Sequence, residues 1–156
     1  MIVLVMGVSG VGKTTIGEAL AAALGARYID ADDYHPPGNV AKMKAGVPLD
    51  DADRQPWLRK LNEVLKRESN AVLGCSALKA AYRRTLAEGI DDFRIVYLHG
   101  TRELIRERLK TRTHRYMPPG LLDSQLATLE PPADAIAIDV AAPLEESVAA
   151  IVARLR

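Results

Sequence analysis

The sequence of 156 residues lacks several features of secreted, membrane and nucleic-acid-binding proteins. Its single cysteine, Cys75, excludes an intramolecular disulfide, and we expect this residue to be a small buried apolar side chain. Aromatic residues make up only 4%, too few for a platform that stacks nucleic-acid bases. The formal net charge is +1, so the overall charge favours neither a nucleic-acid nor a membrane partner.

Long apolar runs are also missing: no stretch reaches about 18 consecutive apolar residues, so no transmembrane helix is expected. A strand-like run starts at Met1, which we expect to leave no room for a signal peptide. No repeat, linker or low-complexity segment is apparent, and 48% hydrophobic residues suffice for one core. The sequence therefore predicts a cytoplasmic protein with a single domain over residues 1–156.

The most informative stretch is residues 7–14, Gly-Val-Ser-Gly-Val-Gly-Lys-Thr, which has the G-x-x-x-x-G-K-[ST] pattern of a phosphate-binding P-loop. Residues 1–6 before it are typical of a buried parallel strand, and Ile16, Leu20 and Leu24 after it have helical spacing. The alternative is a glycine-rich turn that binds nothing, and the agreement of strand, loop and helix argues against it. We therefore predict that the chain binds a nucleoside triphosphate.

Each part of this loop has an expected role. Side chains in place of the loop glycines would keep backbone N–H groups away from the phosphate oxygens, and the amino end of the following helix attracts the same anion. Lys13 is expected to reach the β- and γ-phosphates, and the Thr14 hydroxyl is expected to ligate Mg²⁺. The residues expected to bind the nucleotide here are Gly7, Ser9, Gly10, Val11, Gly12, Lys13, Thr14 and Thr15.

An acidic group, Asp30, Asp32 and Asp33, ends the second expected strand at residues 27–30. Because the carboxyl ends of parallel strands face the ligand crevice, we expect one carboxylate to accept a proton from a substrate hydroxyl and another to hold Mg²⁺ through water. The alternative is a solvated turn or helix cap, for which aspartate is equally suited. The position opposite a P-loop favours the functional interpretation.

A stretch dense in helix-capping residues precedes the third expected strand. Pro56 suits the first turn of a helix, so we expect a helix to start there and to bury Trp57 as a core anchor. Asp51, Asp53 and Arg54 form either an exposed cap network or part of a polar substrate wall, and their spacing leaves both interpretations open.

Residues 71–75 and 93–98 are expected to be the third and fourth strands, because both are apolar and rich in β-branched residues. Lys79 and Arg83 follow the third strand and either clamp an anionic substrate or lie on a solvated helix face. After the fourth strand, we expect residues 110–130, rich in arginine at the start, to form a helical lid that excludes water from phosphoryl transfer. The alternative is a basic, exposed helix.

Residues 135–139 are expected to be the last strand, and Pro143 is expected to open the final helix. Strands that alternate with helices predict an α/β fold, a five-stranded parallel sheet flanked by helices, with the layout of a P-loop kinase and a helical lid. The loop between the last strand and the final helix would then lie near the nucleotide base.

The sequence resembles the bacterial gluconokinases, a small P-loop family that transfers phosphate from ATP to D-gluconate. The resemblance is carried by residues 6–14, 30–36 and 46–58, by residues 75–79 with 82–83, and by residues 117–119, 121–122, 124–125 and 129–132. It implies a fold like that of shikimate and adenylate kinases, with strand order 2-3-1-4-5. It also implies a homodimer, ATP and Mg²⁺ as cofactors, and 6-phospho-D-gluconate as the product.

The resemblance also implies roles for matching positions. Asp32 would act as the general base toward the C6 hydroxyl of gluconate, and Asp30 would help Thr14 to hold Mg²⁺. The implied substrate-binding residues are Asp32, His35, Arg54, Lys79 and Arg83. Arg108 and Arg112 resemble the arginines at the base of the lid, one near adenine and one near the γ-phosphate. The implied catalytic residues are Lys13, Asp32 and Arg112.

One stretch departs from the family. Before the lid proline the family commonly reads Gly-His-Phe-Met, whereas this chain reads His114-Arg115-Tyr116-Met117. The residue that contacts the phosphate is therefore Arg112, His114 or Arg115.

Three other functions are disfavoured. A shikimate or nucleotide kinase would not share the stretches 35–36 and 48–57, which are specific to the gluconokinase resemblance. A GTPase switch would carry an [NT]-K-x-D motif, which the sequence lacks. A binding module would bind ATP without turnover stimulated by a second substrate.

Overall fold

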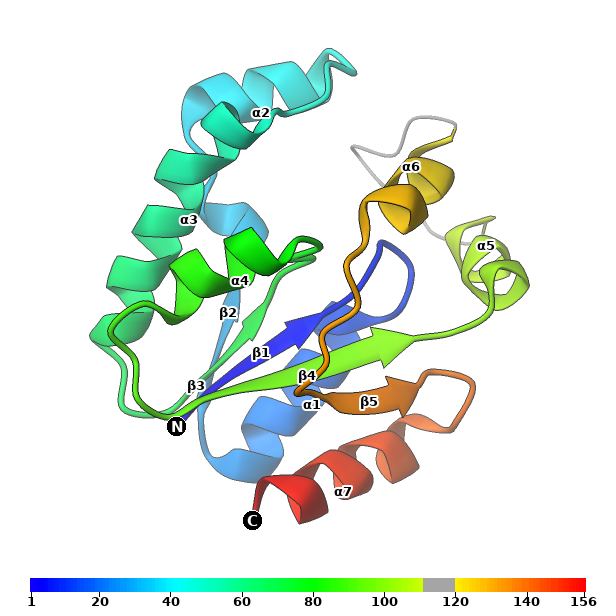
Figure 1. Ribbon diagram of the computed structural model, residues 1–156. Helices are drawn as coiled ribbons and strands as arrows, with labels where there is room; N and C mark the ends of the chain where they lie inside the picture. Colours follow the sequence, from blue (N-terminus) through cyan, green and yellow to red (C-terminus); the bar gives the residue numbers. More distant parts are fainter. Residues whose placement is uncertain (111–119) are drawn as a thin grey trace.

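The computed structural model describes residues 1–110 and 120–156 and contains a five-stranded sheet (Figure 1). All neighbouring strands are parallel, and their order is β2-β3-β1-β4-β5, which confirms the predicted order. The strands are β1 (Ile2–Met6), β2 (Arg27–Asp30), β3 (Ala71–Gly74), β4 (Phe93–His99) and β5 (Ile136–Asp139).

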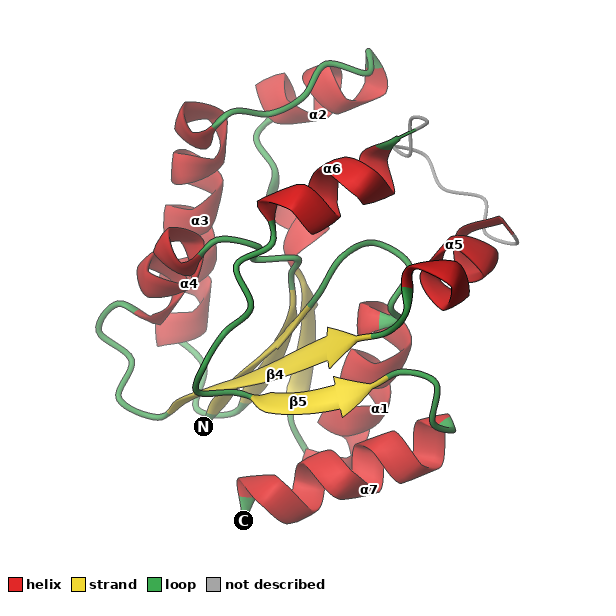
Figure 2. Cartoon of the chain, turned by 45° about the vertical axis from the view of Figure 1, so that its right-hand side comes forward, coloured by secondary structure: helices red, strands yellow, loops and turns green. Residues whose placement is uncertain are grey.

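Helices cover both faces of the sheet (Figure 2). Helices α1 (Lys13–Leu24) and α7 (Leu144–Leu155) lie on one face, and α3 (Asp51–Lys66) and α4 (Ala80–Ala87) lie on the other. Three short helices lie toward the end to which the strands point: α2 (Pro37–Lys44), α5 (Arg102–Lys110) and α6 (Leu121–Thr128). A 3₁₀ turn, η1 (Ala31–Tyr34), directly follows β2.

The central strand β1 is buried over its whole length, because helices cover both of its faces. Val3 and Val5 pack in the layer of α1 and α7, whereas Ile2, Leu4 and Met6 pack in the layer of α3 and α4. This alternation follows from the period of two in a strand. Burial of each large apolar side chain contributes about 1.5–3 kcal/mol, so β1 holds the loop that follows it on a rigid base.

Helix α3 begins earlier than the sequence predicted. The Asp50 carboxylate accepts the N–H of Asp53 at 2.7 Å, and the Asp53 carboxylate accepts the N–H of Asp50 at 3.1 Å. This reciprocal capping box starts the helix at Asp51, so the expectation of Pro56 in the first turn is wrong. Pro56 lies inside the helix on its exposed side, and Trp57 is buried as predicted.

Helix α6 is the described part of the expected lid. Arg102 and Arg106 of α5 pair with Asp123 of α6 at 3.3 and 3.6 Å, so ion pairs join the two helices. The extent of the single domain and of its lid over residues 110–130 stays a prediction. Three residues of the lid prediction lie outside the described part of the chain: Arg112, His114 and Arg115.

In residues 1–110 and 120–156, no helix combines the length and the apolar character needed to cross a lipid bilayer.

Candidate functional site

The parallel register brings the predicted site segments to one edge of the sheet. Gly74 at the end of β3 pairs with Val5 of β1 on one side and with Asp30 of β2 on the other. The P-loop, the acidic group and the segment that leads to Lys79 therefore start side by side. This edge is where open α/β sheets bind ligands.

Besides the predicted approach to phosphate, packing and backbone conformation give the loop glycines further physical reasons. A Cβ at Gly7 would lie 2.7 Å from the carbonyl oxygen of Leu98, and a Cβ at Gly10 would lie 2.9 Å from the Leu109 side chain. Packing against β4 and α5 therefore requires these two glycines. A Cβ at Gly12 would meet nothing within 4 Å, but its φ of +92° lies where residues with a Cβ are strained.

Lys13 lies over the loop that it follows. Its Nζ donates to the carbonyl oxygens of Gly7 at 2.9 Å and Val8 at 3.1 Å. It is also the first residue of α1, and among the described residues no side chain caps this end of the helix. The amide groups of the first turn, which include those of Thr14 and Thr15, are thus suited to an anionic ligand.

Two other predicted nucleotide-binding residues have partners within the protein. The side chain of Val11 is buried in the core, and its N–H donates to Val8 at 3.4 Å. The N–H of Ser9 donates to Oε1 of Gln125 at 2.7 Å, and Nε2 of Gln125 donates to Oγ of Ser9 at 3.2 Å. Helix α6 thereby contacts the P-loop directly. Sequence reasoning missed this role of Gln125, because no spacing rule connects positions this far apart.

Asp30 fits both interpretations of the acidic group. Its Oδ1 accepts the N–H of Asp32 at 2.9 Å and caps the 3₁₀ turn η1. Burial, together with the charges of Asp32 and Asp33, raises the pKa of Asp30, while the charge of Lys13 acts to lower it. A capping carboxylate thus also lies within electrostatic range of the P-loop lysine. The side chain of Asp32 itself is 71% exposed at the open edge.

His35 lies beneath Asp32 and is almost completely buried, with 4% of its side chain exposed. Its ring stacks on Trp57 with 4.1 Å between centroids, and Trp57 Nε1 donates to the carbonyl oxygen of Ala31 at 2.7 Å. Burial, with a smaller effect of the Arg54 charge, lowers the pKa of His35 to about 4. The imidazole is therefore neutral at neutral pH.

A polar cluster joins the amino ends of α3 and α4. Tyr82 Oη donates to Oδ1 of Asp51 at 2.5 Å, and Nζ of Lys79 lies 3.3 Å from the same oxygen. Arg54 donates to Tyr82 Oη at 3.3 Å. The hydrogen bond from Tyr82, followed by that from Lys79, lowers the pKa of Asp51. Two cations and a phenol thus surround one exposed carboxylate.

The sequence left Asp51, Asp53 and Arg54 as either an exposed cap network or part of a polar wall, and the structure divides them between the two. Asp51 and Arg54 belong to a polar wall with α4, whereas Asp53 belongs to the cap network and accepts Lys42 at 2.8 Å. Tyr82 is a member of the wall that was absent from the predicted site residues.

Arg83 is buried and bonded to main-chain carbonyl oxygens, and it lies outside the polar cluster around the Asp51 carboxylate. It is 7% exposed and donates to the carbonyl oxygens of Ala77 at 2.8 Å, Leu78 at 3.2 Å and Glu130 at 2.8 Å. These bonds tie the segment after β3 to the segment after α6. A direct substrate contact by Arg83 stays a prediction. Cys75, at the end of β3, is buried, and burial raises its thiol pKa to about 12.

Several curated proteins similar to this chain carry the name gluconokinase. A probable gluconokinase of Xenopus tropicalis is 48% identical over 90% of this chain and 85% of its own length. A gluconokinase of Gluconobacter oxydans is 50% identical over 83% of this chain and 75% of its own length. The chain belongs to the gluconokinase family. The crystal structure of a gluconokinase from Sinorhizobium meliloti agrees with a TM-score of 0.89 at 45% identity, covering 98% of this chain and 90% of that one.

The match extends to a broader kinase family. A family model described as shikimate kinase matches residues 9–129 of this gluconokinase-family chain. That range starts in the P-loop and ends just after α6, so it includes both sides of the described site.

Arg108, one of the arginines predicted to lie near the nucleotide, contacts the loop after β5. Its Nη2 donates to the carbonyl oxygen of Val140 at 2.6 Å, in the loop after β5 where the nucleotide base is expected. Arg112, the second predicted lid-base arginine, lies outside the described residues.

The lowered pKa of His35 predicts a pH dependence of folding stability. His35 binds a proton near pH 6.5 in the unfolded chain and near pH 4 in the folded chain. The free energy of unfolding therefore falls as the pH drops from about 6.5 to about 4. Between pH 7 and pH 5 we expect His35 to account for a loss of about 1–2 kcal/mol in the free energy of unfolding. Urea unfolding at both pH values, with wild type and His35→Phe, measures this contribution. An equal loss in the two proteins would contradict it.

Proposed function

We propose that this chain transfers the γ-phosphoryl group of ATP to the C6 hydroxyl of D-gluconate, with 6-phospho-D-gluconate and ADP as products. The observation that carries the proposal is the meeting of a P-loop, an exposed carboxylate and a cationic cluster at one edge of the sheet. These three parts match ATP, a reacting hydroxyl and a carboxylate-bearing substrate, and relatives at 48% and 50% identity carry the name gluconokinase.

The reaction asks the protein for positioning and charge neutralisation. The substrate hydroxyl oxygen forms a bond to the γ-phosphorus, and the bond from that phosphorus to the bridging oxygen of ADP breaks. Asp32 accepts the hydroxyl proton, a role for which its exposed carboxylate is available. Lys13 and the amide groups at the start of α1 hold the phosphates.

Arg54 and Lys79 are the proposed partners of the substrate carboxylate. Both approach the Asp51 carboxylate, Lys79 at 3.3 Å and Arg54 at 3.9 Å, so the pair already has a geometry that suits such a group. Their side chains are about one-third exposed, which leaves donor positions open to a ligand. Hydroxyl groups of the sugar acid would lie between this pair and Asp32.

Mg²⁺ is proposed as the metal, with Thr14 and Asp30 as its protein ligands. In the described residues no group of three or more His, Cys, Asp or Glu side chains is arranged to hold a metal. A magnesium site of this kind needs only one or two protein oxygens, because phosphates and water complete its shell. Asp30 fits, since it ends β2 at the edge where the P-loop starts and lies within the electrostatic influence of Lys13, which precedes Thr14 in the sequence. When bound, the ion would neutralise phosphate charge.

The test of the function is a coupled assay of ADP release with MgATP. The acceptors are D-gluconate, related sugar acids, shikimate and nucleoside monophosphates. We expect strong stimulation by D-gluconate alone, because the cationic pair suits its carboxylate, Asp32 suits its hydroxyl, and the similar curated proteins are named gluconokinases. Stimulation by a different acceptor would overturn the substrate, and ATP binding without stimulation by any acceptor would indicate a binding module.

Asp32→Asn tests the proposed proton acceptor. The amide keeps the size of the side chain but cannot accept the proton, so we expect kcat to fall at least about 100-fold while the affinity for ATP stays within about twofold. Asp33→Asn is the matched control, because it removes a neighbouring exposed carboxylate. Turnover of Asp32→Asn close to that of Asp33→Asn would remove Asp32 from the mechanism.

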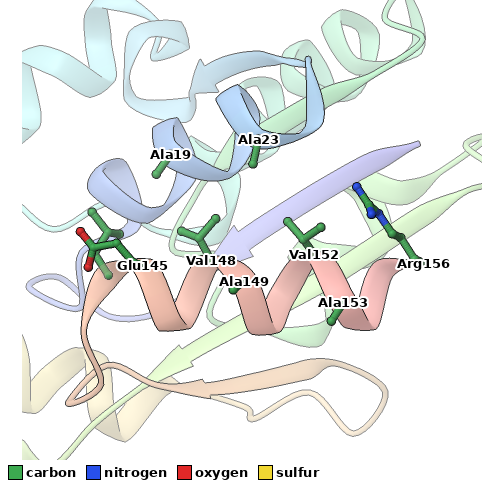
Figure 3. A pocket seen from close by; sticks show the side chains of 9 residues that line it. Ala19, Ala23, Glu145, Val148, Ala149, Val152, Ala153 and Arg156 are labelled. Carbon is green, nitrogen blue, oxygen red and sulfur yellow. The ribbon is translucent and has the colours of Figure 1, made fainter.

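We also propose a homodimer that pairs through α1 and α7. An open groove of about 770 Å³ between these helices is lined mainly by small apolar side chains, among them Ala19 of α1 and Val148 and Val152 of α7 (Figure 3). Glu145 and Arg156 line its two ends. A twofold axis that pairs α7 antiparallel with its copy brings each Glu145 to the partner's Arg156. Cytoplasmic localisation stays a prediction.

Light scattering coupled to gel filtration tests this dimer. We expect twice the chain mass of 17.0 kDa for the wild type and a monomer for Val152→Glu, which places a charge in the groove. Val47→Glu is the control, because Val47 is also apolar and is exposed elsewhere, in the connection between α2 and α3. A monomeric wild type contradicts the homodimer, and a dimeric Val152→Glu contradicts this interface.

A further inference from the structure

Asn39 is a buried polar residue of α2 that has no part in the proposed reaction so far. It is 6% exposed. Its Nδ2 donates to the main-chain carbonyl oxygen of Asp53 at 2.9 Å and lies 3.3 Å from Nδ1 of His35. One amide thus connects α2, the first turn of α3 and the histidine beneath Asp32.

These contacts determine which ring nitrogen of His35 carries the proton. A carbonyl oxygen can only accept a hydrogen bond, so the group of Asn39 that faces Asp53 is the NH₂ group. The same NH₂ group faces Nδ1 of His35, which must therefore be the unprotonated acceptor. In a neutral imidazole the proton is then on Nε2.

The Nε2–H group points to the reaction edge. Nε2 of His35 lies 3.7 Å from Oδ1 of Asp32. The ring has little freedom to turn, because it is stacked on Trp57, which is itself held by the carbonyl oxygen of Ala31. With the opposite tautomer, a lone pair of Nε2 would face the Asp32 carboxylate and repel it.

The neutral state of the ring is part of the same arrangement. Burial, followed by the positive charge of Arg54, lowers the pKa of His35, although the Asp32 carboxylate lies 3.7 Å from Nε2 on the open side of the ring. Burial dominates, so the ring faces Asp32 as a neutral N–H group whose Nε2 lies 3.7 Å from Oδ1, an electrostatic contact longer than a hydrogen bond. A neutral N–H group can orient a carboxylate without placing a positive charge beside it.

We propose that Asn39 is a positioning residue for phosphoryl transfer: by fixing the Nε2–H tautomer of His35, it orients the carboxylate of Asp32 toward the substrate hydroxyl. This inference rests on the function proposed above. It gives His35 a role in holding the proton acceptor, in addition to the substrate contact that the sequence predicted.

The chain offers a matched control for loss of a buried amide. Asn62 of α3 is also 6% exposed, and its Nδ2 donates to two main-chain carbonyl oxygens, those of Leu86 and Glu88, both at 2.9 Å. Asn62→Ala therefore removes an equally buried side chain of the same size, whose Nδ2 also has two partners, from a different helix. It leaves His35 and Asp32 unchanged.

The first measurement is the imidazole ¹⁵N spectrum of the full-length protein at neutral pH, with the His35 signals assigned by comparison with His35→Phe. We expect the Nε2–H tautomer in the wild type and in Asn62→Ala. In Asn39→Ala we expect a mixture of tautomers, and in Asn39→Asp, where a carboxylate accepts from Nδ1, the opposite tautomer. A wild-type signal from the Nδ1–H tautomer would overturn the proposal.

The second measurement is steady-state kinetics of the same variants with MgATP and D-gluconate. For Asn39→Ala we expect kcat to fall on the order of 10- to 100-fold with KM for ATP within about twofold, while Asn62→Ala keeps near-normal kcat. Equal kcat in Asn39→Ala and Asn62→Ala would overturn the proposal. The spectrum needs no turnover, so a wild type that does not phosphorylate gluconate refutes the proposed function separately from the tautomer.

Discussion

The parallel pairing of β1 between β3 and β4 is the constraint on which the rest of the structure depends. Because β1 is buried on both faces, its register with β3 is set by apolar packing in two layers at once. That register places the end of β1, the end of β3 and Asp30 of β2 at one edge. The strand register alone therefore brings the P-loop and the acidic group together, and no direct bond between them is needed.

Features set by local chemistry could be predicted from the sequence. The apolar runs gave the strands, the alternation of strands and helices gave the parallel sheet, and the P-loop pattern marked the phosphate site. The predicted start of α3 was wrong because two local signals, the capping residues Asp50 and Asp53 and the later Pro56, competed. The reciprocal bonds of Asp50 and Asp53 start the helix earlier, and Pro56 is tolerated inside it on the exposed side.

Contacts between distant segments could not be predicted. Asp51 and Asp53 are two positions apart on one helix. Asp51 nevertheless faces Tyr82 of α4 and Lys79 just before α4, whereas Asp53 faces Lys42 of α2. The packing of α2, α3 and α4 against one another decides which partner each aspartate has. The same holds for Gln125 on Ser9, and for Arg83, whose charge suggested a substrate contact but whose hydrogen bonds hold main-chain carbonyls.

The distribution of charge around the site fits a substrate that carries one carboxylate. Arg54 and Lys79 share Asp51, so this wall has one more positive than negative charge before any ligand binds. A substrate carboxylate approaching the wall therefore meets cations that Tyr82 and Asp51 already hold in place, which reduces the loss of side-chain entropy on binding. On the opposite side, a neutral His35 adds no charge beside Asp32. The proposed anion-binding wall and the proposed proton acceptor thus keep separate charges, because burial suppresses the charge of His35 beside Asp32.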